Sequence, residues 1–394
     1  MHIRSLAYLV GLAVAAPAQA DDFDSCLGRL RGEFAAKGIS GATFDRHTQG
    51  LQPDTGVLEL MDAQPEFKQP IWDYLAGLVD EERIADGHAG LRQWASVLGD
   101  AERRFGVDPA TVVAVWGVES DFGKTLGKRP LVTSLATLSC MGRRQGYFQE
   151  EFAATLRLLQ DGDVNPAHLV GSWAGAFGHT QFMPSTYRRI AVDMDGDGRR
   201  DLVDSIPDAL GSTANYLHKS GWQRGEPWGY EVRVPAGLDT SLAGRTKKRP
   251  LSDWVRRGIT RVDGHPLEGA KTSAALLLPA GAEGPGFLVF RNFDAIYSYN
   301  AAESYALAVA HLSDRLRGGG PFVTPWPTPD PGLSRAERRE LQTRLVERGY
   351  QIGNVDGIIG ANTREALLDV QRKQGLPADG RAGRRILEAL RGKP

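Results

Sequence analysis

An apolar segment that carries a single charged side chain most constrains the fold of this chain. Residues 109–118 read Pro-Ala-Thr-Val-Val-Ala-Val-Trp-Gly-Val, and Glu119 is the only charged residue between Asp108 and Asp121. Asp108 is a good helix N-cap and Pro109 suits the first helical position, so the segment predicts a helix. A helix so apolar has to be covered on most sides, and we expect the rest of the chain to be organised around it.

Glu119 is the first candidate functional residue because it lies near the end of this apolar helix. A carboxylate that is buried without a partner tends to keep its proton, and the negative end of the helix dipole raises its pKa further. A carboxylic acid with a raised pKa is what a glycosidase needs to protonate a leaving oxygen. The alternative is a structural glutamate whose charge is satisfied by an arginine or by backbone amides.

Length and periodicity predict a chain of several domains that is mainly α-helical (α+β). The 394 residues are enough for two or three domains, and no long alternating strand pattern appears before residue 230. Alternation at residues 228–236 and apolar runs within residues 276–290 predict strands, so an α-rich body should carry a small β insert. Residues 57–61 fit either a short strand or a helix start, and residues 91–105 have helical spacing.

A Gly/Pro-rich stretch separates a long domain from a short one. Five prolines within residues 319–332 predict an extended, semi-stiff linker. We expect a large domain at residues 21–318 and a compact module at residues 333–392. Within the module, Asp356-Gly357 and Asp379-Gly380 are equivalent turns after similar helices, which indicates an internal duplication. The module shows no catalytic constellation, so binding is the better interpretation.

The N-terminus indicates a secretory signal peptide at residues 1–20. It has a short basic start, an apolar core from Leu6 to Ala16, and a small-x-small cleavage site at residues 18–20. The apolar core is too short to span a membrane, and no cysteine directly follows the cleavage site. We therefore expect an exported, soluble, periplasmic protein with no transmembrane segment and no lipid anchor.

The chain has only two cysteines, Cys26 and Cys140. In an oxidising compartment they can form one disulfide, which would tie the N-terminal segment to the region after the Glu119 helix. The alternative is two separate buried thiols, because the sequence does not give the distance between their Cα atoms.

Residues 193–204 match the spacing of a twelve-residue calcium loop. Hard oxygen ligands at this spacing suit Ca²⁺, and a single loop favours a structural ion over a paired sensor. Asp204 is shorter than the usual glutamate, and Arg200 stands where an apolar residue is usual, so a solvated Asp/Gly turn is the alternative. The candidate ligands are Asp193, Asp195, Asp197, Arg199 through its carbonyl, Asp201 and Asp204.

Residues 171–187 combine glycines, aromatic rings and hydrogen-bonding side chains. Gly171, Gly175 and Gly178 permit a close approach of the backbone to a ligand or to another element. Flat rings together with fixed polar groups suit a sugar ligand. The alternative is tight helix packing around the glycines.

Four short motifs occur in order along the large domain. Residues 116–123 read Trp-Gly-Val-Glu-Ser-Asp-Phe-Gly, residues 171–185 hold the glycine- and aromatic-rich run, and the pairs Asn215-Tyr216 and Tyr299-Asn300 follow. In this order they resemble the motifs of the membrane-bound lytic murein transglycosylase B family, whose signature is Glu-Ser-x-Phe-Gly. Residues 333–390 resemble the peptidoglycan-binding domain type 1.

The resemblance implies a lysozyme-like, mostly helical catalytic domain with a small β-containing subdomain, followed by a small three-helix peptidoglycan-binding domain. Members of the family cleave the MurNAc–GlcNAc β-1,4 bond of peptidoglycan without water and leave a 1,6-anhydro-MurNAc end. The resemblance implies Glu119 as the single catalytic acid and base, and some members have a calcium loop where residues 193–204 lie here. The implied substrate-binding residues are Ser172, Gln181, Phe182, Tyr216, Tyr299 and Asn300.

We therefore expect a lytic murein transglycosylase that binds peptidoglycan glycan strands, works as a monomer, and needs no organic cofactor. A net charge of −1 gives no indication of nucleic acid as a partner. A hydrolytic muramidase is one alternative, but it would need a second carboxylate, and Asp121 should point away from Glu119. A non-catalytic cell-wall-binding scaffold is the other alternative.

Overall fold

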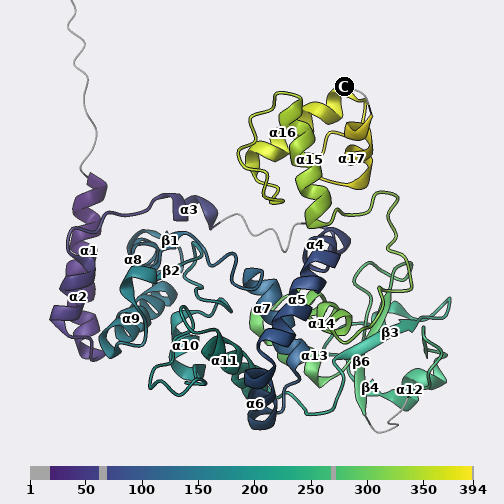
Figure 1. Cartoon of the computed structure of the whole chain (residues 1–394), viewed down its shortest axis with the longest axis horizontal. Helices are drawn as coiled ribbons and strands as arrows, with labels where there is room; N and C mark the ends of the chain where they lie inside the picture. Colours follow the sequence, from purple (N-terminus) through teal and green to yellow (C-terminus); the bar gives the residue numbers. More distant parts are fainter. Residues whose placement is uncertain (1–17, 62–68, 268–271, 393–394) are drawn as a thin grey trace, which may run out of the picture.

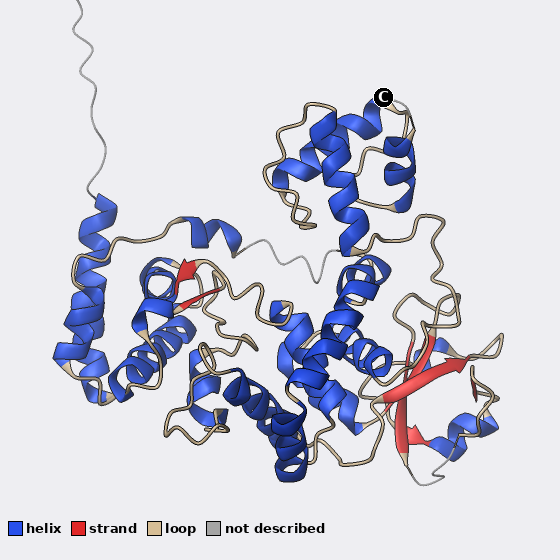
Figure 2. Cartoon of the chain, in the orientation of Figure 1, coloured by secondary structure: helices blue, strands red, loops and turns tan. Residues whose placement is uncertain are grey.

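The computed structural model describes residues 18–61, 69–267 and 272–392 of the chain (Figure 1). The structure is mainly helical, as predicted, with a five-stranded sheet and a separate two-stranded pair (Figure 2). The predicted signal peptide at residues 1–20 lies outside the described residues except for residues 18–20, which open helix α1. Within the described ranges, none of the helices has both the length and the apolarity that crossing a membrane requires.

One group of helices contains the N-terminal part of the chain and encloses its own hydrophobic core. The rings of Phe34, Phe44 and Phe152 meet in this core with centroids 5.5–6.2 Å apart. Residues 57–61, for which strand and helix were both open, fall largely in a short helix. The group consists of α1 (Ala18–Ala36), α2 (Gly41–Thr48), α3 (Gly56–Leu60), α8 (Leu131–Met141), α9 (Gln145–Asp161), α10 (Pro184–Ile190) and the short pair β1 (Arg129–Pro130) and β2 (Val170–Gly171).

A disulfide links two helices of this first group. Cys26 in α1 and Cys140 in α8 are bonded, with their Cα atoms 5.8 Å apart and 114 residues between them in sequence. The tertiary structure thus decides between the bridge and the two separate thiols. The bridge holds the N-terminal helix against the helix that follows α7.

A second group of helices is built around the Glu119 helix, as expected. Helix α7 lies among α5, α6, α11 and α14, and residues 112–115 are at most 1% exposed. The apolar side chains that cover α7 on most sides form the largest core of the protein. The group consists of α4 (Ile71–Leu78), α5 (Glu81–Gln93), α6 (Ala95–Phe105), α7 (Pro109–Ser120), α11 (Ile206–Lys219), α13 (Arg291–Asn300) and α14 (Glu303–Leu316).

Local backbone features set the limits of α7. Asp108 accepts a hydrogen bond from the backbone N–H of Thr111, which caps the first turn as the sequence predicts. The helix ends at Ser120, because the C-cap residue Asp121 has a left-handed φ of +50°, two residues before the predicted stop at Gly123. The helical stretch at residues 91–105 divides into two helices, because Trp94 leaves the helical backbone angles.

A five-stranded antiparallel sheet forms the small β subdomain, in the order β4-β6-β7-β3-β5. Phe287 and Val289 of β7 pack into the helical core, whereas Leu288 faces a separate core with Trp254 of α12 (Leu251–Arg256). Both faces of the central strands are therefore covered, which explains their uninterrupted apolar sequences. The strands are β3 (Gly229–Arg233), β4 (Arg249–Pro250), β5 (Thr260–Arg261), β6 (Ser273–Leu277) and β7 (Gly286–Val289).

The C-terminal module contains three helices, α15 (Arg335–Glu347), α16 (Ala361–Lys373) and α17 (Arg384–Arg391), around a core of its own. Gln342 accepts a hydrogen bond from the backbone N–H in the Asp356-Gly357 turn and donates one to its aspartate. Gln371 makes the same two bonds with the Asp379-Gly380 turn. The repeated pattern supports the internal duplication.

The Gly/Pro-rich linker packs against the large domain. The backbone N–H groups of Val323 and Thr324 donate to the Glu231 carboxylate, each at 2.7 Å. The ring of Phe322 stacks on His311 of α14, with centroids 3.8 Å apart. The linker therefore leads the chain along the domain surface to α15, which lies next to α4 (Figure 1).

Candidate active site

Glu119 lies in the last turn of α7 and opens on a cleft of about 230 Å³. Four parts of the chain supply the walls: α4, α7, the α13–α14 region and the C-terminal module. Among the described residues that line the cleft, Glu119 is the only one with a carboxylate. The lining residues are Gln69, Tyr74, Gly77, Leu78, Val118, Glu119, Asn300, Tyr305 and Arg338.

The environment of Glu119 keeps its side chain protonated. Burial raises the pKa of Glu119 to about 8, although a hydrogen bond from Tyr305 acts in the opposite direction. In that bond, Tyr305 Oη lies 2.5 Å from Glu119 Oε1. Within the described part of the chain no arginine or lysine pairs with Glu119, so it is not the charge-satisfied structural glutamate of the alternative interpretation. At pH 7 the carboxyl group can donate a proton.

Three of the predicted binding residues form an aromatic cluster beside Tyr305. The ring centroids of Phe182, Tyr216 and Tyr299 lie 4.7–5.7 Å apart, and the Tyr299 ring stacks on that of Tyr305 at 6.2 Å. The hydroxyls of Tyr216 and Tyr299 each donate to a backbone carbonyl at 2.7 Å. Burial, together with the nearby Glu119, raises the pKa of Tyr299 well above its ordinary value. The cluster brings motifs that are distant in sequence close to the Glu119 carboxyl.

The structure gives the predicted residues different positions around the site. Asn300 lines the cleft with Glu119. Phe182 is 2% exposed, so it supports Tyr216 and Tyr299 and does not present a ring to a ligand. The sequence missed this distinction, because an aromatic residue in a motif can serve either purpose.

Ser172 and Gln181 shape the loop at residues 171–182, which has no helix of the kind that the packing alternative required. Ser172 Oγ accepts a hydrogen bond from the N–H of Ala176 at 3.0 Å. Gln181 has a φ of +51°, and its side chain donates to the carbonyls of Gly178 and Leu126. Neither residue is among those that line the Glu119 cleft, so their contact with substrate stays a prediction.

This loop is fastened to the end of α7 by the residues that follow Glu119. Ser120 Oγ donates to the carbonyl of His179 at 2.5 Å and accepts from the N–H of Gly123 at 2.9 Å. Gly123 has a φ of +84°, and a Cβ there would lie 2.5 Å from the His179 ring. The serine and glycine of the Glu-Ser-x-Phe-Gly motif therefore have structural roles that hold the sugar-binding candidate loop beside the acid.

The candidate calcium loop brings three of its predicted ligands together. Carboxylate oxygens of Asp193, Asp195 and Asp197 lie within 4.8 Å of one another. The loop geometry comes from its own turns, since Asp193 accepts from the N–H groups of Gly196 and Gly198. Three hard oxygen donors at this separation fit a Ca²⁺ ion.

The remaining predicted ligands have other partners. Asp201 binds the Arg199 side chain and two backbone N–H groups, and Asp204 pairs with His168 at 2.9 Å. Ligation by Asp201, Asp204 and the Arg199 carbonyl therefore stays a prediction, since both carboxylates lie outside the three-aspartate cluster. The sequence also missed the buried Asp208, which accepts bonds from three backbone N–H groups of the loop.

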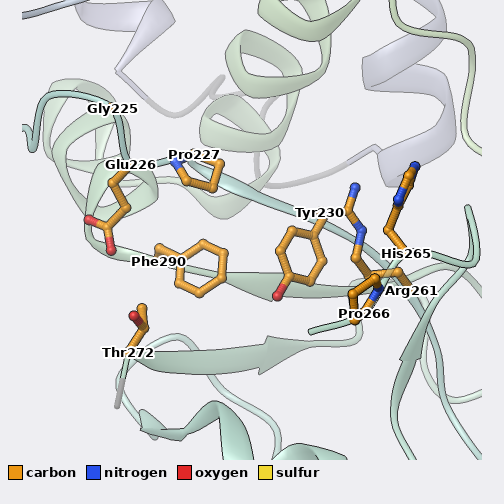
Figure 3. Close-up of a pocket in the computed structure, with 9 residues that line it drawn as sticks. All are labelled: Gly225, Glu226, Pro227, Tyr230, Arg261, His265, Pro266, Thr272 and Phe290. Atoms are coloured by element: carbon orange, nitrogen blue, oxygen red, sulfur yellow. The ribbon is translucent and has the colours of Figure 1, made fainter. Parts of the chain in front are cut away.

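A larger cleft, of about 440 Å³, lies at the β subdomain and contains none of the predicted site residues (Figure 3). Tyr230 and Phe290 meet edge to face at 5.3 Å, and the Arg261 guanidinium lies 4.5 Å from the Tyr230 ring centroid. Figure 3 shows the Glu226 carboxyl beyond Phe290, at the end opposite His265. No convergent acid and hydrogen-bond donor comparable to Glu119 and Tyr305 is present among these residues.

Comparison with known families shows to which family the chain belongs. The transglycosylase SLT domain family matches residues 22–314. The chain belongs to this family. A peptidoglycan binding domain family matches residues 334–390, which cover the C-terminal module of this SLT transglycosylase.

Individual relatives agree with this assignment. Membrane-bound lytic murein transglycosylase B of Escherichia coli (strain K12) is 33% identical over 302 residues, or 72% of this chain and 81% of that protein. SltB3 from Pseudomonas aeruginosa, solved in complex with NAG-anhNAM-pentapeptide, is 48% identical with a TM-score of 0.76, covering 94% of this chain and 99% of that one. Escherichia coli Slt35, solved in complex with calcium, is 31% identical with a TM-score of 0.65, covering 75% and 92%. The predicted family, lysozyme-like fold class and lytic transglycosylase activity are confirmed.

The sequence analysis missed two residues of the Glu119 cleft. Tyr305 lies 186 residues after Glu119 and is one of many apolar positions in a helix. Arg338 belongs to the C-terminal module, for which the sequence predicted binding without any connection to the catalytic cleft. Neither residue carries a local signal, because both reach the cleft only through tertiary packing.

Proposed function

We propose that this SLT transglycosylase cleaves the β-1,4 bond between MurNAc and GlcNAc in peptidoglycan without water and leaves 1,6-anhydro-MurNAc ends. The observation that carries the proposal is Glu119, whose pKa burial raises to about 8 and which stands without a second carboxylate among the described residues of its cleft. A hydrolase with two carboxylates needs its second one about 5–9.5 Å away. The nearest in sequence, Asp121, is bound by Arg83 and Arg335.

In the first step Glu119 acts as a general acid. Its proton passes to the glycosidic oxygen, the bond from that oxygen to C1 of MurNAc breaks, and the GlcNAc hydroxyl leaves. The MurNAc acetamido group stabilises the oxocarbenium-like centre at C1. Tyr305 supports this step because its hydrogen bond favours the carboxylate that Glu119 becomes.

In the second step Glu119 acts as a general base. It accepts the proton of the C6 hydroxyl of the same MurNAc, whose oxygen bonds to C1 and closes the 1,6-anhydro ring. The proton that Glu119 gave is thereby returned, and no water is consumed. One carboxyl group suffices because the substrate supplies its own nucleophile.

The remaining predicted residues fit a binding role around this centre. Tyr216 and Tyr299 present partly covered rings next to Tyr305, and Asn300 offers an amide in the cleft. Ser172 and Gln181 lie in the loop attached to the end of α7, from which they would contact the sugar N-acetyl and neighbouring groups. The assignment of these five residues to substrate binding is part of the proposal.

The cellular setting follows from the same substrate. An exported protein with a signal peptide at residues 1–20 would meet peptidoglycan in the periplasm. The proposed division is a catalytic domain at residues 21–318, a linker at 319–332 and a peptidoglycan-binding domain at 333–392, acting as a monomer on glycan strands. The matched peptidoglycan binding family supports a wall-binding role for the last domain.

Digestion of purified sacculi tests the reaction class. We expect mass spectrometry to find muropeptides with 1,6-anhydro ends, each lighter by one water than the corresponding reducing product, because the C6 hydroxyl replaces water as nucleophile. Digestion in H₂¹⁸O should leave the new ends unlabelled.

Two outcomes would favour the alternatives. Reducing ends that carry ¹⁸O would identify a hydrolytic muramidase. Binding to sacculi without release of any muropeptide would identify a non-catalytic scaffold. The raised pKa of Glu119 argues against the scaffold, since a carboxyl buried for no catalytic purpose costs stability.

We further propose that the loop at residues 193–204 binds one structural Ca²⁺ through Asp193, Asp195 and Asp197. The three oxygen donors of the cluster support it. A bound cation would offset the repulsion among the three carboxylates and hold the loop before α11.

Calcium should stabilise the folded protein. With Ca²⁺ at 100 times its dissociation constant we expect the free energy of unfolding to rise by about 2–3 kcal/mol, seen as a higher melting temperature that EDTA reverses. Asp193→Asn should abolish the difference. Asp24→Asn, an exposed change of the same charge in α1, should preserve it. Equal melting temperatures of the wild-type protein in Ca²⁺ and in EDTA would contradict the proposal.

A further inference from the structure

The C-terminal module contacts the catalytic domain through a cluster of arginines. Arg335, Arg338 and Arg381 of the module face the carboxylates and carbonyls of α4, of the start of α5 and of the end of α7. We call these three residues the docking arginines. Their contact lies beside the Glu119 cleft, because Arg338 also lines that cleft.

Arg335 joins the module to the end of the catalytic helix. Its guanidinium binds Asp80 through Nε at 3.0 Å and Nη2 at 3.2 Å, and it also donates to Asp121, the C-cap residue of α7. Although burial lowers it, these two carboxylates raise the pKa of Arg335 above its usual value. The Asp80 side chain is 4% exposed, so the pair is screened little by water.

Arg381 makes a second fixed contact. It binds both oxygens of Asp73, through Nε at 2.5 Å and Nη2 at 2.6 Å, and it also pairs with Asp330 in the linker. Hydrogen bonds from Asp73 raise the pKa of Arg381. Two-point carboxylate contacts of this kind fix orientation as well as distance.

Arg338 differs from the other two docking arginines because no carboxylate pairs with it among the described residues. Its Nε donates to the carbonyl of Leu333 at 3.1 Å and its Nη2 to the carbonyl of Asp73 at 3.0 Å. The nearest carboxylates, Asp73 and Asp80, are engaged by Arg381 and Arg335. Burial consequently lowers the pKa of Arg338 below its usual value.

A glycine of the catalytic domain leaves space for the Arg338 guanidinium. A Cβ on Gly77 of α4 would lie 2.5 Å from Nη2 and 2.7 Å from Cζ of Arg338, so the guanidinium rests directly on the glycine. Both residues line the cleft that holds Glu119. A guanidinium that faces a substrate cleft without a carboxylate partner is suited to an anion that arrives with the substrate.

We propose that Arg338, supplied by the peptidoglycan-binding module, binds a carboxylate of the glycan strand in the catalytic cleft and thereby determines substrate specificity. This inference rests on the proposed function, since it takes peptidoglycan as the substrate. A guanidinium receives a carboxylate through paired N–H donors, and Nη1 has no hydrogen-bond partner among the described residues. The module therefore forms part of the wall of the active site, and the other two docking arginines hold it there.

Two carboxylates of the strand have the required chemistry. One is carried by the peptide stem, and the other is the lactyl carboxylate of MurNAc, which is free only where the stem has been removed. Kinetics on both substrates separate these sources: strands that keep their stems, and strands stripped of stems by an amidase.

The test compares full-length Arg338→Gln with the wild-type protein on each substrate. We expect KM to rise tenfold or more on the substrate whose carboxylate Arg338 binds, with kcat changed less than twofold and with added salt raising the wild-type KM. Arg339→Gln is the matched control, because Arg339 is the next residue on α15 and pairs with Glu82 at the same contact. It should leave KM unchanged on both substrates.

A second variant tests the proposal independently of any folding defect in Arg338→Gln. Gly77→Ala displaces the guanidinium from the catalytic side while leaving Arg338 in place, and it should raise KM on the same substrate. An unchanged KM in Gly77→Ala and Arg338→Gln would overturn the proposal, as would an equal rise in Arg339→Gln. Failure of the proposed function is separate, because it would appear as wild-type products without anhydro ends.

Discussion

Glu119→Gln is expected to lower kcat about a thousandfold or more on purified sacculi, because one carboxyl group performs both proton transfers. Glutamine keeps the size and the hydrogen-bonding oxygen of the side chain but can neither give nor accept the proton. Binding to sacculi should persist, since the cleft walls and the peptidoglycan-binding module are untouched. The measurement is the release of soluble muropeptides over time.

The control is Glu102→Gln, the same exchange at an exposed position of α6, which should retain wild-type activity. Undiminished digestion by Glu119→Gln would remove Glu119 from the mechanism. Unfolding of the variant would be a separate result, visible by circular dichroism before any assay.

The pH profile tests the same residue in another way. Activity should fall as the pH rises through about 8, where Glu119 loses the proton that it must donate. Tyr305→Phe removes a hydrogen bond that lowers the pKa of Glu119, so the falling limb should move to higher pH while the maximal rate decreases. A limb that stays in place would show that another group controls it.

The raised pKa of Glu119 also predicts a gain in stability for Glu119→Gln. Between pH 4.5 and about 8 the unfolded chain has lost this proton and the folded protein has kept it, so wild-type stability decreases with rising pH. Glutamine lacks this dependence. At pH 8 the variant should be more stable by roughly 2 kcal/mol, a value reduced for partial exposure of the side chain, and at pH 4 the difference should vanish.

Removal of the disulfide is the second change for which we expect a large effect, in this case on stability. Replacing both Cys26 and Cys140 by alanine should lower the free energy of unfolding by about 3–4 kcal/mol, because the bond closes a loop of 114 residues in the unfolded chain. Activity at 25 °C should remain, since neither cysteine lines the Glu119 cleft. Urea unfolding followed by tryptophan fluorescence measures the loss.

A reductant distinguishes the effect of losing the disulfide bond from the effect of replacing the two side chains. Dithiothreitol should destabilise the wild-type protein by a similar amount and should leave the double variant unchanged. Identical unfolding midpoints for the oxidised wild-type protein and the double variant would show that the bond adds nothing to stability. Because the bond ties α1 to α8, the loss should appear first as exposure of the N-terminal helices to proteolysis.

Local sequence signals were reliable where the physical cause is itself local. The N-cap Asp108, the apolar run that follows and the lone Glu119 predicted both the central helix and its acid, because capping and apolarity act over one helix. The equivalent turns at Asp356-Gly357 and Asp379-Gly380 predicted a repeat that the matching hydrogen bonds of Gln342 and Gln371 now support. The calcium loop shows the limit, because spacing predicted six ligands, whereas in the folded loop Asp201 and Asp204 contact Arg199 and His168 and only three aspartates cluster.

The sequence by itself determined that a mainly helical chain would bury a helix ending in one glutamate, with a small β insert and a C-terminal module. Only the tertiary structure decided what surrounds that glutamate. Tyr305 arrives from a helix 186 residues away, and Arg338 arrives from the module. The reason is physical. Helix propensity and the apolar face of a helix depend on residues that are close in sequence, whereas hydrogen bonds and unpaired charges at a cleft depend on how separate elements pack.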